Sequence, residues 1–341
     1  MRARITAFTL FAFSFMGLAA SGASAQVTLQ SIKQRGTLIC GSNVTIEGFG
    51  IVGPQGHWMG FDVDFCRAIA AAIFNDPTKV RFTSLDAKDR FTALQSGEVD
   101  VLSRNTTWTM SRDTQLGLDF PAITYFDGQG FMVRKALGIS SAKDLNGKSI
   151  CVEPSTTTEL NLADYFRANN MKYEPMALIP DEVSRTYDAD GCDALTADTF
   201  ALYSHHFLTS HPDDHIVLPE IISKEPLGPA VRQDDPQWVD LVRWVHHAML
   251  NAEEFGVTRE NVEQMIRTSD HPEVRRLLGT EGQFGDALGL TKDWAVRIIK
   301  HVGNYGEVFE RNLGEGSRLK IKRGRNALWT KGGLQYGIPI R

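Results

Sequence analysis

The chain has only one long hydrophobic run, and that run lies near its beginning. Arg2 and Arg4 precede the mostly apolar stretch 5–20, and residues 23–25, ASA, are small residues of the kind found at a cleavage site. The run is short and rich in Ala, Ser, Thr and Gly, which argues against a membrane anchor. We therefore expect residues 1–25 to be a cleaved secretory signal and the protein to be exported.

The chain also lacks an excess of positive charge. It has 36 Lys and Arg against 41 Asp and Glu, and its formal net charge of −5 becomes −7 once Arg2 and Arg4 leave with the signal. A nucleic-acid-binding protein would favour a clustered basic face, so we expect no nucleic-acid partner. A local basic run at 318–325 is interpreted as a solvated face, with a docking surface for a membrane partner as the alternative.

Few residues have the spacing of a metal site. The cysteines form no CxxC pair and have no zinc-like histidine spacing beside them. Four histidines within residues 203–215 lie near two aspartates, but their irregular spacing beside Pro212 favours a solvated loop. Residues 188–199 begin like a calcium loop, yet Thr199 stands where a bidentate Glu is required. We expect no metal and no other cofactor.

The stretch 98–113, EVDVLSRNTTWTMSRD, is the strongest candidate for a binding site. Residues 99–102 suit a buried strand of a parallel sheet, and a loop rich in hydroxyls and amides, 103–107, follows. Ligands of open α/β sheets bind at the carboxyl ends of such strands. Arg112 offers a planar fork that can grip a carboxylate through two hydrogen bonds. On spacing alone, a surface turn with an exposed Arg is the alternative.

Periodic segments predict further strands and helices. We expect strands at 36–41, 79–84, 131–133, 149–152, 193–196 and 216–218, and helices at 62–74, 89–97, 236–255, 262–266 and 294–302. Asp62 and Asp64 lie in the first turn of the helix at 62–74, and we interpret them as capping and packing residues.

Near the ends of these elements, one polar segment and one aromatic residue each admit two interpretations, and one carboxylate needs a partner. Residues 153–158 open a helix that runs to about 169 and has free amides for an anion, although Thr156 and Glu159 also form a capping box. Phe49, in the loop after the first strand, can stack on a ligand or fill the core. Asp198 follows the strand at 193–196, where its carboxylate needs a partner such as an ammonium group.

Three separated motifs resemble the polar amino-acid-binding proteins that serve bacterial ABC importers. They are GFDVDF at 60–65, the strand-loop-Arg stretch above, and GCDALTAD at 191–198. The C-terminal runs HVGNYGEVFERN and NALWTKGGLQY are similar to those of the general L-amino-acid-binding branch, which has broad specificity. The resemblance covers nearly all of the mature chain. It implies an α/β, two-lobed periplasmic binding protein fold of type II, in which each lobe has a mainly parallel sheet flanked by helices and two crossover strands join the lobes.

The resemblance also implies how the chain is divided. Residues 26–125 would form the first part of lobe 1, 126–226 lobe 2, and 227–341 the return to lobe 1 with a C-terminal helical extension. The crossovers are expected near 122–128 and 225–229. Four cysteines allow three pairings. Because a bridge between lobes would obstruct hinge motion, we favour the two pairs within lobes, which are Cys40–Cys66 and Cys151–Cys192.

The family likeness assigns roles to individual residues. Arg112 is expected to take the α-carboxylate of an amino acid, helped by Thr107 and Thr157. Asp198 is expected to take the α-ammonium group, helped by the backbone carbonyl of Asn105 and the Thr107 hydroxyl. Since Arg112 and Asp198 lie on different lobes, the ligand would bridge the cleft and favour a closed state.

The remaining expected ligand-binding residues form the walls and the side-chain pocket. Phe49 is implied as a wall of the site, and Thr156 is placed beside the ligand. Arg104 follows the broad-specificity branch, and its guanidinium could bind acidic or amide side chains. Glu153 departs from the Gln expected there, which leaves the ligand range open.

The expected function is that of the substrate-binding component of an amino-acid ABC importer. It would be a periplasmic monomer that captures free L-amino acids between its lobes and delivers them to the membrane permease subunits. The alternatives are an enzyme on the same fold, such as a periplasmic cyclohexadienyl dehydratase or a lytic transglycosylase, and a sensory receptor module. The sequence offers no nucleophile–base pair, so we expect no catalytic residues. We also expect no signalling domain after the lobes, which argues against the sensory module.

Overall fold

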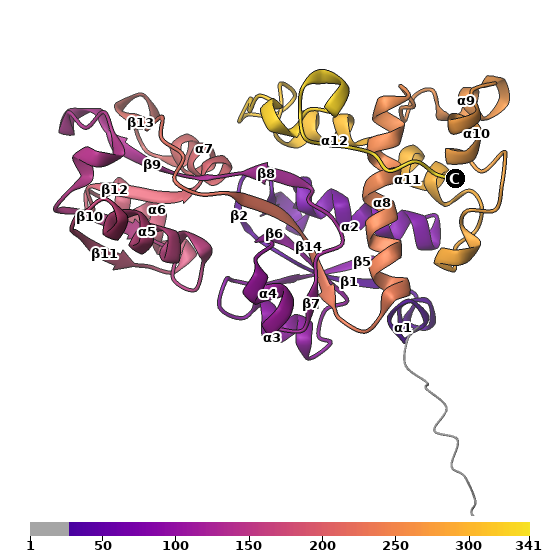
Figure 1. Cartoon of the computed structure of the whole chain (residues 1–341), viewed down its shortest axis with the longest axis horizontal. Coiled ribbons are helices and arrows are strands. Elements are labelled where there is room, and N and C mark those ends of the chain that lie inside the picture. Colours follow the sequence, from indigo (N-terminus) through magenta and orange to yellow (C-terminus); the bar gives the residue numbers. More distant parts are fainter. Residues whose placement is uncertain (1–26) are drawn as a thin grey trace, which may run out of the picture.

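The computed structural model describes residues 27–341, so the expected signal at 1–25 lies outside the described residues. Two lobes are joined by the strands β8 (Tyr125–Asp127) and β14 (Glu225–Arg232), with the second lobe at the left in Figure 1. The two-lobed α/β architecture predicted from the sequence is confirmed. Within the described part of the chain, no helix has the length and apolar character needed to cross a membrane.

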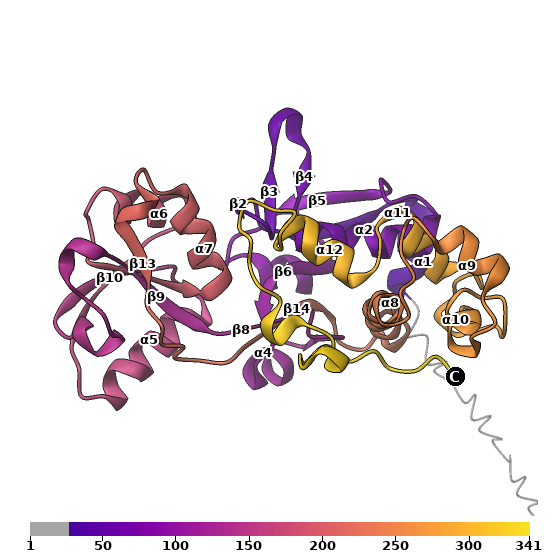
Figure 2. The same ribbon diagram turned by 90° about the horizontal axis from the view of Figure 1, so that it is seen from above.

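The sheet of the first lobe has the strand order β5-β1-β6-β14-β7, and β8 pairs with β14. β1 runs parallel to β5 and β6, whereas β14 is antiparallel to β6, β7 and β8. A three-stranded sheet, β2-β3-β4, projects from this lobe (Figure 2). The strands of these two sheets are β1 (Leu38–Ser42), β2 (Thr45–Ile46), β3 (Gly50–Val52), β4 (Trp58–Met59), β5 (Val80–Ser84), β6 (Val101–Thr107), β7 (Leu118–Asp119), β8 (Tyr125–Asp127) and β14 (Glu225–Arg232).

The sheet of the second lobe has the order β11-β10-β12-β9-β13. β10 is parallel to β11 and β12, and β9 is antiparallel to β12 and β13. Its strands are β9 (Gln129–Arg134), β10 (Lys148–Val152), β11 (Tyr173–Ala177), β12 (Ala194–Asp198) and β13 (His215–Val217). The helices of this lobe are α5 (Thr157–Ala168), α6 (Pro180–Asp188) and α7 (Thr199–Leu208).

The helices outside the second lobe include a group near the C-terminus. α9 and α10 lie at the end of the molecule opposite the second lobe in both ribbon views (Figures 1 and 2). The helices are α1 (Val27–Arg35), α2 (Phe61–Phe74), α3 (Arg90–Gln95), α4 (Met110–Gln115), α8 (Pro236–Glu254), α9 (Val262–Thr268), α10 (Pro272–Leu277), α11 (Trp294–His301) and α12 (Tyr305–Asn312). Short 3₁₀ turns occupy Pro54–Gly56, Lys135–Leu137, Ala142–Leu145, Pro212–Asp214, Asp286–Leu288, Gly324–Asn326 and Trp329–Lys331.

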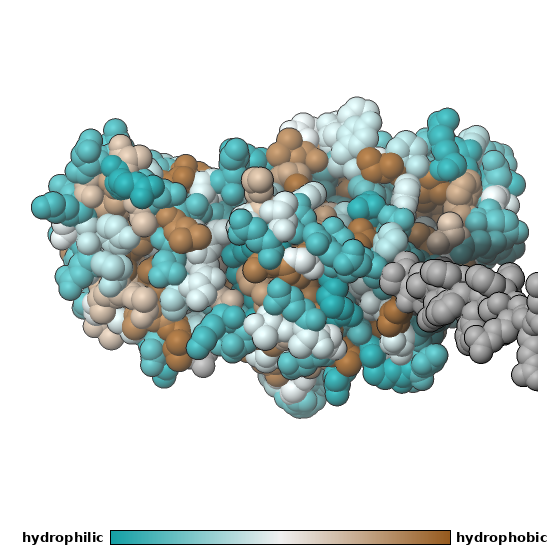
Figure 3. Space-filling view, turned by 60° about the horizontal axis from the view of Figure 1, so that its bottom comes forward, coloured by the Kyte–Doolittle hydropathy of each residue, from teal (hydrophilic) through white to brown (hydrophobic). Residues whose placement is uncertain are grey.

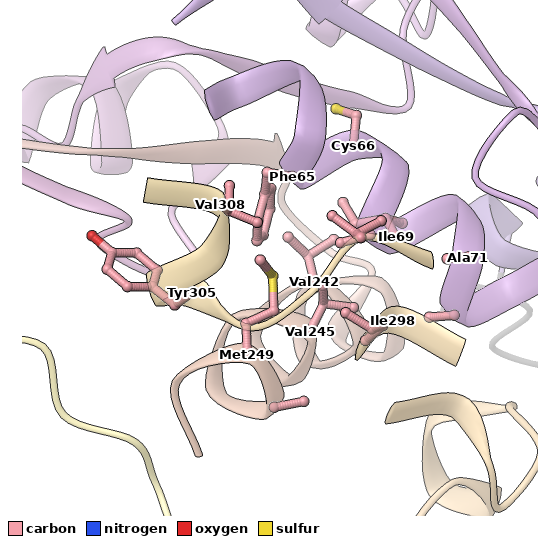
Figure 4. Close-up of a cluster of buried hydrophobic side chains, with 14 of the residues drawn as sticks. Phe65, Cys66, Ile69, Ala71, Val242, Val245, Met249, Ile298, Tyr305 and Val308 are labelled. Atoms are coloured by element: carbon pink, nitrogen blue, oxygen red, sulfur yellow. The ribbon is translucent and has the colours of Figure 1, made fainter. Parts of the chain in front are cut away.

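One hydrophobic core unites the first lobe with the C-terminal helices. The apolar face of α8 contributes Val242, Val245 and Met249, which are at most 2 % exposed and meet α2, α11 and α12 in Figure 4. Fully burying such a side chain contributes about 1.5–3 kcal/mol relative to leaving it exposed. The C-terminal extension is therefore held to the lobe by its own apolar faces. On the face shown in Figure 3, by contrast, hydrophobic residues are scattered among hydrophilic ones.

The crossover strands β8 and β14 pair with each other between the lobes. Glu225 lies opposite Asp127, and Leu227 lies opposite Tyr125. The chain changes sheets between residues 127 and 129 and returns between 217 and 225. These changes lie close to the predicted division at 125/126 and 226/227, and the division itself stays a prediction.

Two disulfide bonds are present, each within one lobe. Cys40 on β1 is bonded to Cys66 on α2, and Cys151 on β10 is bonded to Cys192 just before β12. The favoured pairing is confirmed.

Two local predictions were wrong. Residues 103–107 are not a loop, because β6 continues to Thr107 by pairing with Leu227 and Gly228 of β14. The histidine-rich stretch 203–215 is not a solvated loop throughout. α7 extends to Leu208, and His215, which is 6 % exposed, begins β13.

Candidate functional site

A cavity lies between the two lobes, where the carboxyl ends of β6 and β12 come together. The first lobe lines it with residues from β2, α3 and β6, and the second lobe with residues that follow β10 and with parts of α6, β12 and α7. The lining residues are Thr45, Ile46, Arg90, Arg104, Asn105, Thr107, Glu153, Thr156, Thr157, Thr158, Pro180, Val183, Thr196, Ala197, Asp198, Ala201 and His205. Seven of the predicted ligand-binding residues are therefore brought together: Arg104, Asn105, Thr107, Glu153, Thr156, Thr157 and Asp198.

Asp198 brings a buried carboxylate to the cavity. It is the last residue of β12 and is 8 % exposed, and its Oδ1 has no hydrogen-bond partner among the described residues. Burial raises the pKa of Asp198 well above its usual range, and the negative charges of Glu225 and Asp127 raise it further. A cation at Oδ1 would favour the carboxylate form and supply the missing partner. This is the chemistry expected of a site for an ammonium group.

Arg112 lies on α4, at the edge of the same site. Its Nη1 donates a hydrogen bond to the backbone carbonyl of Thr107 at 2.9 Å, and its guanidinium carbon lies 5.1 Å from the centre of the Phe91 ring. Burial lowers the pKa of Arg112 to about 10, while Glu225 and Asp198 oppose that shift. Arg112 therefore stays charged at neutral pH. It contacts the cavity through Thr107 and is not itself a lining residue.

Arg104 and Glu153 connect the two lobes across the cavity. Arg104 is 2 % exposed, donates from Nε to the carbonyl of Leu85 at 2.7 Å, and has its Nη2 at 3.4 Å from Glu153 Oε1. Burial lowers the pKa of Arg104, and the charge of Glu153 is the largest opposing effect. The Glu that replaces the expected Gln thus partly neutralises Arg104.

Arg90 is a site residue that sequence reasoning missed. It is the first residue of α3, it is 3 % exposed, and its Nε has no hydrogen-bond partner among the described residues. Burial lowers the pKa of Arg90, as do the positive charges of Arg104 and Arg112, whereas Glu153 and Asp198 raise it. The sequence feature that could have identified Arg90 is its position after the strand β5, because parallel neighbouring strands end at the same edge of the sheet.

Asn105 is held in an unusual backbone conformation. Its φ is +34°, and its N–H donates to Asp62 Oδ2 at 2.7 Å, while the Ser103 hydroxyl donates to Asp62 Oδ1 at 3.2 Å. Burial raises the pKa of Asp62 to about 6. Asp62 therefore positions the strand end that carries Asn105, in addition to lying in the first turn of α2.

Thr156 is the N-cap of α5, as its capping interpretation predicts. Its hydroxyl accepts from the N–H of Glu159 at 3.1 Å and donates to the carbonyl of Glu153 at 2.7 Å. The Glu159 carboxylate accepts from the N–H of Ser155 instead of completing a capping box. Thr156 lines the cavity, but its hydroxyl hydrogen is already used by the protein.

Phe49 does not line the cavity. It is 1 % exposed and stacks on Phe200 of the second lobe, with 3.7 Å between the ring centres, and it meets Tyr125 edge-on at 5.1 Å. This arrangement matches the alternative in which Phe49 fills the core. Its predicted contact with a ligand stays a prediction.

His205 also lines the cavity, from α7. Its Nδ1 lies 2.5 Å from the Ser184 hydroxyl, and burial lowers its pKa to about 4. His205 is therefore neutral at physiological pH. No group of His, Cys, Asp or Glu side chains that could hold a metal ion occurs within residues 27–341.

Known proteins match nearly the whole chain. The sequence profile of bacterial extracellular solute-binding proteins, family 3, matches residues 38–260. The chain is 57 % identical over 330 residues to the general L-amino acid-binding periplasmic protein AapJ of Rhizobium johnstonii, covering 96 % of each. It is 52 % identical over 332 residues to the glutamate/glutamine/aspartate/asparagine-binding protein BztA of Rhodobacter capsulatus, covering 96 % of this chain and 98 % of that one. A solved ABC transporter periplasmic binding protein from Brucella ovis, with glutathione bound, shares 60 % identity and a TM-score of 0.90, covering 92 % of this chain and 99 % of that one.

Proposed function

The chain belongs to family 3 of the bacterial extracellular solute-binding proteins, and from this membership we propose that it is the substrate-binding component of an amino-acid ABC importer. It captures amino acids in the periplasm and delivers them to the membrane permease. It is a binding protein and not an enzyme. The relatives that match it over nearly their whole length are binding proteins too. The enzyme alternative on this fold has no comparable support.

The observation that carries this proposal is the unpartnered, buried oxygen of Asp198 in a cavity between two lobes. An amino acid offers an α-ammonium group to Asp198 and an α-carboxylate to Arg112, which stands on the other lobe. The first-turn N–H groups of α5 other than that of Glu159, which Thr156 caps, have no partners within the helix and support the carboxylate. Because the two charged contacts come from different lobes, binding favours the closed arrangement. A micromolar affinity requires about 8 kcal/mol, which two buried charge-assisted contacts and excluded water can supply.

The charges around the side-chain pocket favour acidic and amide amino acids. Arg104 is paired with Glu153, whereas the Nε of Arg90 has no hydrogen-bond partner among the described residues. A carboxylate or amide oxygen on the ligand side chain would accept from Arg90. The partial neutralisation by Glu153 is consistent with a broad ligand range, as in the relative named for glutamate, glutamine, aspartate and asparagine.

Glutathione is a second candidate ligand, because the 60 % identical relative from Brucella ovis holds it. The γ-glutamyl end of glutathione carries a free α-ammonium and a free α-carboxylate. The same contacts from Asp198 and Arg112 therefore suit that end of the molecule.

Several finer points belong to the same proposal. We propose that residues 1–25 are a signal removed on export and that the mature protein acts as a monomer. The lobes would be 26–125 with 227–341, and 126–226. The ligand-binding residues would be those predicted from the sequence, with Arg90 added.

A thermal-shift screen with the twenty amino acids and glutathione tests the proposal. A ligand that binds only the folded protein raises the melting temperature by mass action. At one hundred times its Kd, it adds about 2.7 kcal/mol to the free energy of unfolding. We expect glutamate, aspartate, glutamine and asparagine to raise it. If no amino acid changes the melting temperature, the proposed function is wrong.

A further inference from the structure

Glu225 is a buried carboxylate between the lobes. It begins β14 on the returning crossover, is 1 % exposed, and lies opposite Asp127 of β8. The sequence marks this segment only as a connection with proline and glycine.

The carboxylate of Glu225 accepts four hydrogen bonds. Its Oε2 accepts from the hydroxyl of Thr107 at 2.6 Å and from that of Thr157 at 3.1 Å. Its Oε1 accepts from the side-chain amide of Asn161 and the hydroxyl of Ser223, each at 2.7 Å. An ionised carboxylate offers about four acceptor positions, so this one is fully used. Any effect of Glu225 on a ligand must therefore pass through its donors.

Two of those donors line the cavity, one from each lobe: Thr107 and Thr157. A hydroxyl has one hydrogen to donate and two lone pairs that accept. The two hydroxyl oxygens also lie 3.2 Å from each other, but hydrogen bonds to an ionised acceptor are the stronger ones. The hydrogens of both hydroxyls are therefore directed to Glu225, and only lone pairs are left for the cavity.

We propose that Glu225 is a positioning residue that makes the hydroxyls of Thr107 and Thr157 acceptors for the ammonium group of the ligand. This inference rests on the proposed function, because it concerns the same site. It assigns the Thr157 hydroxyl to the ammonium group, whereas the family resemblance implied that this hydroxyl helps to bind the carboxylate. The carboxylate is then held by Arg112 and by the first-turn amides of α5.

The consequence is selection for the amino group itself. Glutarate has both carboxylates of glutamate but no ammonium group, so it meets only lone pairs at Thr107 and Thr157. Exchanging Thr157 for valine keeps the shape of the side chain and removes its hydroxyl. If that hydroxyl accepts from the ammonium group, the exchange harms glutamate and leaves glutarate almost unaffected.

The experiment measures glutamate binding by titration calorimetry and glutarate binding by displacement, for the wild type, Thr157→Val, Glu225→Gln and the double variant. We expect Thr157→Val to weaken glutamate about tenfold, as for one hydrogen bond to a charged group, and glutarate less than about twofold. Glu225→Gln should lower the preference for glutamate over glutarate. In the Glu225→Gln background, Thr157→Val should lose most of its selective effect, because the two residues act as one unit.

The outcomes separate this inference from the proposed function. If Thr157→Val weakens both ligands by the same factor, its hydroxyl serves the carboxylate and the inference is wrong. If Glu225→Gln fails to fold, the Thr157→Val comparison still decides. If the wild type binds glutamate and the preference is unchanged in every variant, only the inference falls. A wild type that binds no amino acid overturns both.

Discussion

Asn326 and Phe126 exchange two hydrogen bonds at the outgoing crossover. The N–H of Phe126 donates to Asn326 Oδ1 at 2.7 Å, and Asn326 Nδ2 donates to the carbonyl of Phe126 at 3.1 Å. Nearby, Tyr305 and Gln335 both donate to the carbonyl of Thr124, at 2.9 and 3.1 Å. All three side chains come from the region beyond residue 260, where the family match ends. The C-terminal extension thus holds the backbone that enters the second lobe.

Asn326→Ala should destabilise the protein by roughly 1–3 kcal/mol, because it leaves the partly buried N–H and C=O of Phe126 on β8 without these partners. Thermal or urea unfolding measures the change. Arg325→Ala is the matched control, since Arg325 is exposed one residue earlier. Equal stability of the two variants would contradict a role for Asn326 at the crossover.

Arg90→Met should narrow the ligand range. The substitution keeps a long apolar stem and removes the buried guanidinium, so acidic amino acids lose a charge-assisted contact of about 1.5–3 kcal/mol. We expect about tenfold or more weaker binding of glutamate and a smaller change for alanine, measured by calorimetry. If both amino acids weaken by the same factor, Arg90 acts on the site as a whole and does not read the ligand side chain.

Amino-acid affinity should fall as the pH is lowered. Burial raises the pKa of Asp198 in the free protein, with help from Glu225 and Asp127. The ammonium group of a bound ligand favours the carboxylate and lowers that pKa again. Affinity is therefore greatest above the raised pKa and declines as the pH falls through it, with proton release on binding in that range.

Calorimetry between pH 5 and 8, in buffers with different ionisation enthalpies, measures this proton release. Asp127, with a pKa raised to about 7, and Asp62, with a pKa raised to about 6, lie nearby and titrate between pH 5 and 8 as well. Asp127→Asn is therefore the companion variant. If the pH dependence of the affinity disappears in this variant, Asp127 and not Asp198 is its cause.

Removing the disulfide between Cys151 and Cys192 should destabilise the protein. The bond closes a segment with a sequence separation of 41 residues, and the chain-entropy relation gives roughly 4 kcal/mol for such a loop. Unfolding of the double alanine variant, with and without ligand, measures this loss. An unchanged denaturation midpoint would show that the bridge adds little to the stability of the folded protein.

Local patterns predicted the elements whose stability is local. α2 and α8 have apolar side chains at helical spacing, so their positions follow from the sequence alone. β6 was predicted too short because Thr106 and Thr107 are in a strand only through pairing with β14, more than one hundred residues away. α7 was missed because its histidines resembled a polar loop, although Phe200 and Leu202 anchor it in the core.

The site was predicted in part, and for different reasons. The family resemblance supplied the two lobes, the disulfide pairing and the two charged contacts, none of which follows from periodicity. Arg90 and Glu225 were missed because each lies at the end of an ordinary element, where only tertiary packing decides whether a charged side chain turns inward. The sequence left two roles possible for Phe49, which were stacking on a ligand and filling the core. Its burial against Phe200 depends on how the lobes meet.

The decisive measurement is titration of glutamate into the wild type, Arg112→Gln and Asp198→Asn, with the exposed Arg167→Gln and Asp164→Asn on α5 as matched controls. If one charge on each lobe grips the amino acid, the wild type and both controls bind with micromolar or tighter Kd. Each site variant should then have a Kd about one hundred times that of the wild type or higher, because loss of one partner of a buried charge pair costs about 2–5 kcal/mol. Binding by Arg112→Gln or Asp198→Asn with the wild-type Kd would contradict this arrangement of the site.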